Sequence, residues 1–176
     1  MSHRVVLSKD DIARSLKRIA HEIIEGLASV DSVLVLGIPT RGVHLANRLA
    51  AILSSLSPGF SVQLGVLDVT MYRDDAVDAG RVITATEIPP TGLDGSIVIL
   101  VDDVLYSGRT IRAALDAIVD YGRPAQVKLA VLVDRGHREL PIRPDFIGKN
   151  LPTSSQERVS VRLVESDGVD EVVIAS

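Results

Sequence analysis

Apolar residues along the chain follow two different spacings, and these spacings predict its secondary structure. From Ile12 to Leu27 they recur every three or four positions, which predicts an amphipathic helix, and Ser8 with Asp11 marks its start. Continuous apolar runs such as Ile97–Val101 are typical of buried strands. Further helices are predicted over 43–56 and 110–121, and further strands over 33–36, 62–69, 127–133, 159–164 and 169–174.

Strands that alternate with helices indicate an α/β fold with a mainly parallel sheet. The polar, acidic residues 70–82 predict a mobile loop, and the proline-containing residues 134–157 predict a long ordered one. In open parallel sheets, ligands bind beyond the carboxyl ends of the strands. Function is therefore expected where the chain leaves the strands, at 37–42, at 102–110 and from 134 onward.

Composition narrows the class of protein. A length of 176 residues suits a single domain over 1–176, and the absence of cysteine excludes disulfides, Cys-ligated zinc and cysteine nucleophiles. The first residues lack the apolar segment of a signal peptide, and the apolar runs fall short of the roughly 20 residues of a membrane helix, so we expect a cytoplasmic protein without membrane contact.

The net charge is −4, but acids gather in 68–103 and bases in 135–162, so a local basic surface can coexist with the negative total.

The sharpest chemical signal is the segment VILVDDVLYSGRT, from Val98 to Thr110. A buried strand leads into Asp102 and Asp103, and a loop of small and hydroxyl residues then enters a helix. Backbone N–H groups at a helix start favour phosphate, whereas the two carboxylates suit neutral hydroxyls or a cation. A ligand with a phosphate at one end and a diol nearby, such as ribose 5-phosphate, fits both halves. The alternative is a strand end with solvated acids and a capped helix.

This segment resembles the phosphoribosyl pyrophosphate (PRPP) motif of type I phosphoribosyltransferases. Together with Tyr106, three other segments resemble the PyrR family of pyrimidine operon regulators, which are also uracil phosphoribosyltransferases. The resemblance runs from about Arg18 to Val159. It implies a type I phosphoribosyltransferase fold, in which a small hood, from about 134–164 and the N-terminal segment, covers the carboxyl ends of the strands. The three segments are GIPTRG at 37–42, TMYRDD at 70–75, and DRGHRELPIR through GKN at 134–150.

The resemblance also implies roles for individual residues. Asp102 and Asp103 would take the ribose hydroxyls, Arg73 would close over the pyrophosphate, and Mg²⁺ would arrive with PRPP rather than on a protein metal site. From the residues alone, the alternatives are a solvated loop charge for Arg73 and an ordinary glycine-bounded turn for 40–42. The other implied ligand residues are Thr40, Arg41 and Gly42 over the pyrophosphate; Val104, Leu105, Tyr106, Ser107, Gly108, Arg109 and Thr110 around the nucleotide and its 5′-phosphate; and Val133, Asp134, Arg135 and Val159 around uracil.

A second, basic surface is expected to bind RNA. The outer side of the first helix carries several cations, which alone indicates no more than a solvated face, but the resemblance implies binding of pyrimidine-gene (pyr) mRNA leader RNA under control of UMP or UTP. Lys17 stands where the family usually has Thr, and Gly26 where it often has Arg, which puts the RNA preference in doubt. The predicted RNA-binding residues are Arg14, Lys17, Arg18, His21, His137, Arg138, Arg143 and Lys149.

Three functions remain as alternatives at this stage. The first is a bifunctional uracil phosphoribosyltransferase and RNA regulator. The second is a nucleotide-sensing RNA regulator with negligible catalysis, and the third is a phosphoribosyltransferase without an RNA role. In each case the resemblance implies a homodimer or a higher homo-oligomer.

Overall fold

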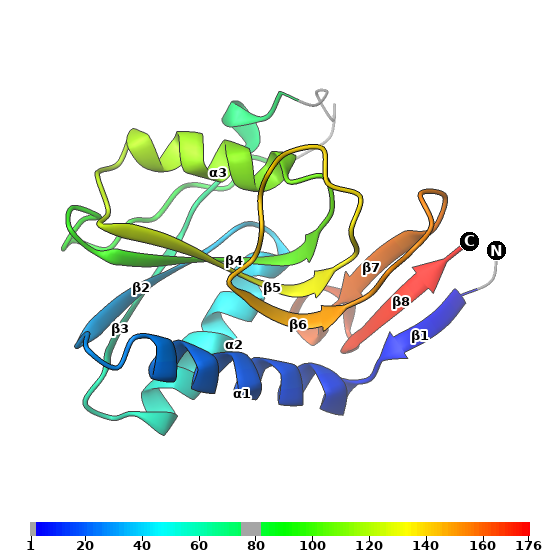
Figure 1. Ribbon diagram of the computed structural model, residues 1–176, viewed down its shortest axis with the longest axis horizontal. Helices are drawn as coiled ribbons and strands as arrows, with labels where there is room; N and C mark the ends of the chain where they lie inside the picture. The colour runs from blue at the N-terminus through cyan, green and yellow to red at the C-terminus, as the bar shows by residue number, and fades with distance from the viewer. Residues whose placement is uncertain (1–2, 75–81) are drawn as a thin grey trace.

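The computed structural model describes residues 3–74 and 82–176. A parallel sheet with strand order β3-β2-β4-β5-β6 forms its centre, and a smaller antiparallel sheet, β1-β8-β7, stands beyond the carboxyl ends of the central strands (Figure 1). The strands are β1 (His3–Leu7), β2 (Ser32–Gly37), β3 (Ser61–Val66), β4 (Ile97–Leu105), β5 (Gln126–Asp134), β6 (Phe146–Asn150), β7 (Arg158–Arg162) and β8 (Glu171–Ala175). The helices are α1 (Lys9–Gly26), α2 (Arg41–Leu56), α3 (Arg109–Val119) and α4 (Val164–Asp167), with a 3-10 turn, η1, at Thr70–Tyr72.

Helices cover both faces of the central sheet, so its middle strands are apolar on both sides. In β2, Val33 and Val35 face the core beneath α1 and α2, whereas Leu34 and Leu36 face the core beneath α3. This alternation follows from the opposite directions of successive side chains in a strand. Figure 1 shows α3 on one side of the sheet and the two long helices on the other. Within the described residues, no helix combines the length and the apolar character needed to cross a membrane.

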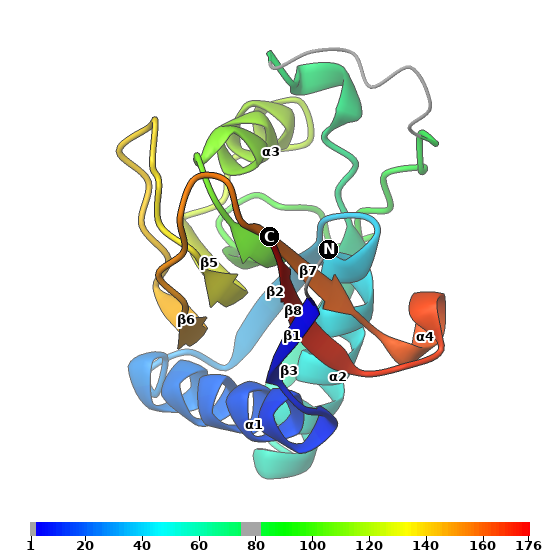
Figure 2. The ribbon, with the colours of Figure 1, turned by 90° about the vertical axis from the view of Figure 1, so that its right-hand side faces the viewer.

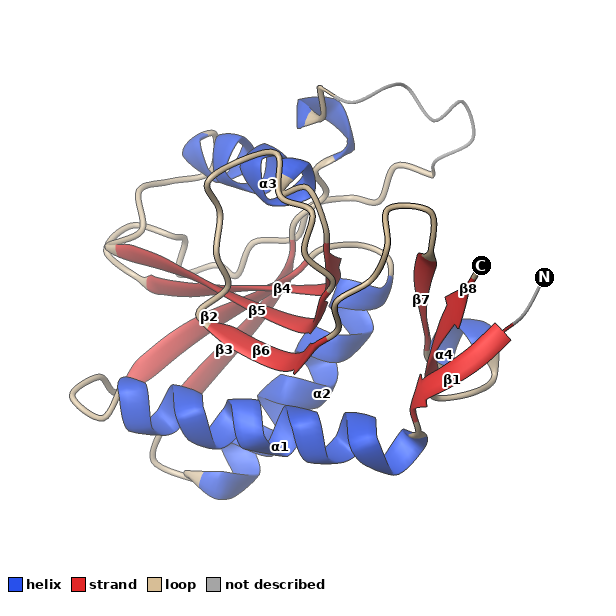
Figure 3. Cartoon of the chain, turned by 45° about the vertical axis from the view of Figure 1, so that its right-hand side comes forward, coloured by secondary structure: helices blue, strands red, loops and turns tan. Residues whose placement is uncertain are grey.

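Helix α1 begins with the capping box that Ser8 and Asp11 predict. The Asp11 amide donates to the Ser8 hydroxyl, and the Ser8 amide donates to the Asp11 carboxylate at 2.8 Å. The apolar stripe of the helix, from Ile12 to Ile23, is buried. On the other side of the helix, Arg18 donates to the carbonyl oxygens of Ile147 and Gly148 in β6. Because β6 is an edge strand, these contacts tie α1 to the open edge of the sheet (Figure 3).

Two expectations about strands are wrong. The segment 134–157 is not one long loop, because β6 lies within it and pairs in parallel with β5. Its apolar part is short, so only the tertiary pairing reveals it; the backbone amides of Leu129 and Asp145 take part in reciprocal contacts that start this pairing. The small sheet also differs from the expected hood of 134–164 plus the N-terminal segment. It consists of β1, β8 and β7, whereas β6 belongs to the central sheet.

The small sheet is held to the body by an ionic contact along one face of α2. Arg48 donates to the Glu165 carboxylate at 2.7 and 2.8 Å and to the Asp170 carboxylate at 2.7 and 3.0 Å. Hydrogen bonds from Arg48 hold the pKa values of both acids below their ordinary range. Two helix turns earlier, Arg41 makes a two-pronged contact with Asp167. The turn at 165–170 therefore docks on α2 through charge.

We predict that Arg48→Met lowers the free energy of unfolding at neutral pH by about 1.5–3 kcal/mol, because charge-assisted hydrogen bonds to two acids are lost. Acids with lowered pKa values contribute stability above their unfolded pKa and lose it as the pH falls. The deficit should therefore shrink toward pH 3 in urea titrations. The exposed Arg112, paired with Asp74 and Asp116, provides the control, and Arg112→Met should cost less than about 1 kcal/mol. Equal losses in the two variants would contradict the docking role of Arg48.

Candidate functional site

The loops that leave the carboxyl ends of the central strands surround a cleft of about 490 Å³. It brings together the two segments that the sequence singled out at 40–42 and 102–110, and it adds Asp68 and Thr84, which sequence reasoning missed. The Asp68 carboxylate accepts from the amides of Thr70 and Thr84 at 2.8 and 2.6 Å, so it joins the two ends of the loop that carries Arg73. Of that loop, residues 75–81 lie outside the described part of the chain.

The two adjacent acids lie inside β4 rather than after it. The strand stays paired with β5 as far as Leu105, and Asp102 lies opposite Val131. Asp102 is only 7 % exposed, so the alternative of a strand end with solvated acids does not hold for this residue, and the prediction that both acids lie outside the core is wrong for it. Burial raises the pKa of Asp102 well above its usual range, and the negative charge of Asp103 adds to this, while the nearby Arg73 lowers it. Asp103 is half-buried and accepts from the Val104 amide at 2.7 Å.

A small hollow of about 110 Å³ lies between β4 and the start of α3. Gly108 turns the chain there with a φ of +94°, which a side chain would disfavour. The Ser107 hydroxyl accepts from the Arg109 amide, and Nη1 of Arg73 donates to the Thr110 hydroxyl at 2.8 Å. Backbone amides at a helix start, two hydroxyls and one guanidinium are a suitable set of donors for a phosphate. Arg73 thus contacts the expected 5′-phosphate segment at Thr110.

The loop at 40–42 is shaped by close packing. A side chain at Gly42 would come within 2.5 Å of the Val101 carbonyl oxygen, so only glycine lets α2 begin against β4. Thr40 is exposed at the cleft. Arg41 is held by the Asp167 carboxylate at 2.7 and 3.1 Å, a partner that the sequence did not reveal because it comes from the distant 163–168 turn. A ligand that needs the Arg41 guanidinium has to share it with Asp167 or displace it.

The remaining residues of the 104–110 segment have mixed surroundings. Val104 lines the cleft and the hollow, whereas Leu105 is buried in the core beneath α3. The guanidinium of Arg109 donates to the Glu139 carboxylate at 2.7 Å and to the Asp74 carboxylate at 3.1 Å. It therefore bridges two loops on either side of α3.

Tyr106 connects this site to the segment after β5. Its ring stacks under the guanidinium of Arg135, at 4.2 Å, and its carbonyl oxygen accepts from Arg138 at 2.9 Å. Arg135 is buried and also donates to the Thr153 hydroxyl and to the carbonyl oxygens of Ser154 and Glu157. Such a cation–π contact is stronger when the cation is desolvated. Arg135 thus fastens three loops together.

The four residues expected around uracil do not offer four side chains to a ligand. Val133 is completely buried in the core beneath α1 and α2, so only its backbone can face a base. Asp134 ends β5 and accepts from Arg138 at 2.6 Å. Burial alone would raise the pKa of Asp134, but the hydrogen bonds from Arg138 and from the Gly136 amide lower it overall. Val159 is half-buried in β7 of the small sheet.

The residues expected to bind RNA divide into two groups. Arg18 and Arg138 make several hydrogen bonds within the chain: Arg18 with β6, and Arg138 with Asp134, Tyr106 and Ile142. Nε2 of His137 lies 2.5 Å from the Thr153 carbonyl oxygen and can donate to it. Arg14, Lys17, His21, Arg143 and Lys149 form the second group; they are exposed, as Arg18 and His137 also are, and Arg14 pairs with Asp11 on its own helix. Helix α1 packs beside β6, so both groups lie at one edge of the central sheet (Figure 2).

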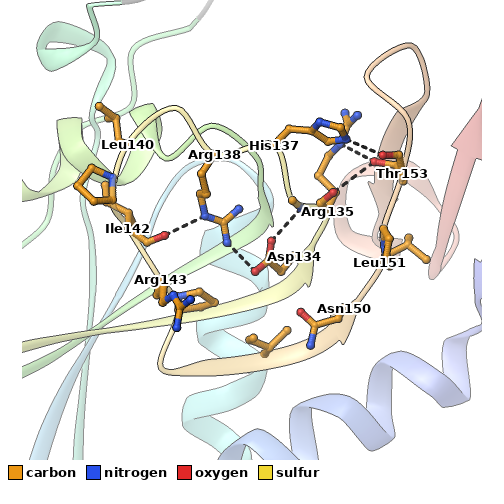
Figure 4. A pocket seen from close by; sticks show the side chains of 15 residues that line it. Asp134, Arg135, His137, Arg138, Leu140, Ile142, Arg143, Asn150, Leu151 and Thr153 are labelled. Carbon is orange, nitrogen blue, oxygen red and sulfur yellow. Dashed lines mark hydrogen bonds and ion pairs between the residues drawn. The ribbon is translucent and has the colours of Figure 1, made fainter.

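A second, larger groove of about 790 Å³ opens at this edge, away from the acids (Figure 4). One wall is the segment 134–144, the other is 150–153, and Ile147 of β6 also lines it. Arg138 and Asp134 point toward each other across the first wall, while His137 and Arg135 reach the second wall at Thr153 (Figure 4). The sequence identified the first wall, and it identified Asn150 only as part of the GKN segment without a role, but it did not identify Leu151 or Thr153.

We predict that Asp102→Asn stabilises the fold in a pH-dependent way. A carboxyl whose pKa is raised on folding costs stability as the pH rises through that value, because charge must then be buried. The amide is neutral throughout and can still accept the hydrogen bond of the Asp103 amide. The unfolding temperature of the variant should exceed that of the parent at pH 8, and the difference should shrink toward pH 4. A variant less stable than the parent at pH 8 would contradict the assigned burial.

Comparison with known proteins assigns the fold and the family. The phosphoribosyl transferase domain family matches residues 6–163. The chain resembles the hypoxanthine phosphoribosyl transferase of Trypanosoma cruzi with a TM-score of 0.75 at 17 % identity, over 98 % of this chain and 91 % of that one. It also resembles a hypoxanthine-guanine phosphoribosyltransferase of Bacillus anthracis with a TM-score of 0.73 at 14 % identity, over 98 % and 97 % of the two chains. Both likenesses concern the fold and confirm the expected type I phosphoribosyltransferase architecture.

Relatives of higher identity narrow the family. A bifunctional protein PyrR of Streptomyces coelicolor is 59 % identical over 98 % of this chain and 90 % of its own length. A bifunctional protein PyrR of Pelotomaculum thermopropionicum is 56 % identical over 96 % and 93 % of the two chains. Since these matches span nearly all of both sequences, the chain belongs to the phosphoribosyl transferase domain family and, within it, to the PyrR family of bifunctional proteins.

Proposed function

We propose that this protein transfers the phosphoribosyl group of PRPP to uracil, giving UMP and pyrophosphate, and that it also binds the leader RNA of pyrimidine genes in response to UMP or UTP. The main observation behind the proposed transferase activity is the buried Asp102 with Asp103 beside it. The hollow at Ser107–Thr110, proposed for the phosphate, follows these acids directly in the chain. We further propose that the protein acts in the cytoplasm as one domain per chain and as a homodimer or higher homo-oligomer.

In the proposed reaction, N1 of uracil forms a bond to C1 of the ribose while the bond from C1 to the pyrophosphate oxygen breaks, and the N1 proton is released to solvent. Positive charge develops on the ribose and negative charge on the leaving group. The acids Asp102 and Asp103 orient the ribose hydroxyls and face the developing positive charge. The Ser107–Thr110 hollow, completed by Arg73, holds the 5′-phosphate and fixes the position of C1 over the cleft.

The pyrophosphate is expected beside Thr40 and Arg41, where α2 begins. Gly42 allows the amides of this helix start to approach a ligand near β4. The guanidinium of Arg41 can donate to the leaving group while it also pairs with Asp167, or after it leaves Asp167. The uracil would lie between the end of β5 at Asp134 and Val159 of the small sheet, with the Val133 contribution limited to its backbone.

Magnesium fits this site as a companion of the substrate. Within the described residues, no three acidic, histidine or cysteine side chains gather to hold a metal by themselves. Two adjacent carboxylates are nonetheless oxygen ligands of the kind that Mg²⁺ prefers when substrate phosphates complete its shell. When bound with PRPP, Mg²⁺ supplies positive charge at the leaving group.

The RNA half of the proposal is favoured by the exposed cations at the β6 edge, which lie apart from the transfer site. Lys17, His21, Arg143 and Lys149 are exposed there, on two elements that pack together. A negatively charged chain such as RNA binds mainly through contacts of this kind. This observation favours the bifunctional protein over a phosphoribosyltransferase without RNA. The sensor with negligible catalysis is the remaining candidate, and an assay of transfer separates the two.

The assay is formation of UMP from uracil and PRPP with Mg²⁺. The parent should turn over, and Asp102→Asn combined with Asp103→Asn should lower the turnover by at least about 100-fold, because the charge that faces the ribose is lost. Arg4→Ala, which removes an exposed cation on β1, is the control and should keep the parental rate. An inactive parent would favour the sensor, and a double variant within a few-fold of the parent would overturn the site assignment.

The phosphate loop and the RNA surface are joined by hydrogen bonds, which suggests how a nucleotide controls RNA binding. The Ser107 carbonyl oxygen accepts from the amides of Glu139 and Leu140 at 2.9 and 3.1 Å, and the Tyr106 carbonyl oxygen accepts from Arg138. The loop that would hold the 5′-phosphate thus continues directly into one wall of the large groove. A ligand that orders one of them orders the other.

We predict that UMP tightens RNA binding by about 5–150-fold, the usual range of coupling between two sites. RNA should tighten UMP binding by the same factor. Arg138→Met, which removes the links to Tyr106 and Asp134, should bring this factor close to 1. The measurement is RNA affinity with and without UMP at fixed salt and Mg²⁺. Equal coupling in parent and variant would show that the signal travels by another route.

A further inference from the structure

The large groove at the β6 edge has the lining of a ligand site rather than of a chance hollow. Its volume of about 790 Å³ lies within the range of sites that bind small molecules, roughly 300–1,000 Å³. Most of its walls are aliphatic, and a few polar groups stand among them. The aliphatic lining includes Leu140, Pro141, Ile142, Pro144, Ile147 and Leu151.

The charge around the groove favours an anion-bearing ligand. Arg135, His137, Arg138 and Arg143 line it, and the carboxylate of Asp134, which also lines it, is paired with Arg138 at 2.6 Å. Arg143 is exposed, and Lys149 stands exposed on the neighbouring strand. A ligand here would meet an apolar interior with cations in and around it.

The two walls are fixed to each other, so the groove exists before a ligand arrives. His137, in a left-handed conformation with a φ of +63°, reaches the Thr153 carbonyl oxygen, and Arg135 reaches the Thr153 hydroxyl at 3.0 Å. Arg138 holds the first wall by donating to the Ile142 carbonyl oxygen at 2.8 Å. A preformed apolar site loses less free energy to ordering when it binds.

An unstacked nucleobase of single-stranded RNA matches these features. Bases in RNA loops are flat and largely apolar on their faces, carry hydrogen-bonding edges, and remain attached to phosphates. The aliphatic walls suit the faces, and Arg143 and Lys149 suit the adjoining phosphates. The side chain of Asn150, which ends β6 and lines the groove, offers both a donor and an acceptor to a base edge.

We propose that this groove takes one or more unstacked bases of the RNA loop, and that Asn150 reads a base edge there. The proposal rests on the RNA-binding half of the proposed function and specifies how RNA is recognised. In this proposal, residues of the second wall at 150–153 recognise the RNA sequence, and the exposed cations contact the RNA phosphates.

The test fills the groove without removing a charge. Asn150→Trp places a large side chain at the exposed end of β6, and Gln156→Trp places the same side chain on an exposed loop position outside the groove lining. The probe is a pyrimidine-gene leader RNA with a single-stranded loop, and an RNA duplex of equal length is the comparison. Asn150→Trp should weaken leader binding at least about tenfold and leave duplex binding unchanged, while Gln156→Trp should match the parent for both.

Salt dependence separates base contacts from phosphate contacts. The slope of log affinity against log salt should be unchanged in Asn150→Trp, whereas Arg143→Ala should flatten it by about 1 unit. Asn150→Ala, which removes only the amide, should reduce the discrimination between the leader and a variant leader with altered loop bases. UMP formation by each Asn150 variant verifies that the domain is folded.

The outcomes distinguish this proposal from the one on which it rests. A parent that binds neither leader nor duplex would overturn the RNA half of the proposed function. A parent that binds the leader, together with an Asn150→Trp variant that binds it equally well, would overturn the base groove alone and leave it to a partner of another kind. Loss of leader and duplex binding together in Asn150→Trp would also overturn it, since the groove would then serve backbone contact only.

Discussion

Strand β4 stays paired with β5 four residues beyond its apolar run, and the positions of the functional groups depend on this pairing. Val104 and Leu105 lie opposite Val133 and Asp134, so the phosphate loop and the segment after β5 leave the sheet side by side. The same pairing buries Asp102, because it keeps this residue within the paired part of the strand, opposite Val131. A strand that ended at Val101 would leave Asp102 in the loop that follows, closer to solvent.

The cost of the buried acid is consistent with a ligand site rather than a structural one. Burial disfavours the charged form of Asp102, and a hydrogen bond from the Asp103 amide and the positive charge of Arg73 offset this only in part. Buried ionisable groups that lower the stability of the fold are common in ligand sites, where the bound ligand supplies the missing interactions. In contrast, the acids that dock the small sheet on α2 are matched by Arg41 and Arg48, and their pKa values are lowered.

The arginines at this end of the molecule have different tasks despite their similar appearance in the sequence. Arg135 and Arg138 connect loops through carbonyl oxygens, a tyrosine ring and one carboxylate, so their charges help to build the surface. Arg143 and Lys149 remain exposed and are suited to phosphates. The planar guanidinium can satisfy several acceptors at once, which explains why arginine occupies the connecting positions. The proposed nucleotide and RNA sites therefore share one hydrogen-bonded scaffold.

The sequence by itself determined the α/β class, the start and apolar stripe of α1, the central apolar strands, and the 40–42 and 102–110 segments, because these depend on local spacing and on residues adjacent in the chain. The family resemblance was needed for the uracil and RNA assignments. Only the tertiary structure decided that β6 is a strand, that β1 joins β8, and that Asp102 is buried, since these depend on pairing between distant segments. It also decided which cations find a partner within the chain: Arg41 meets Asp167, and Arg18 meets the open edge of β6, across more than 120 residues of chain. Charge alone cannot reveal a partner that folding brings from so far away.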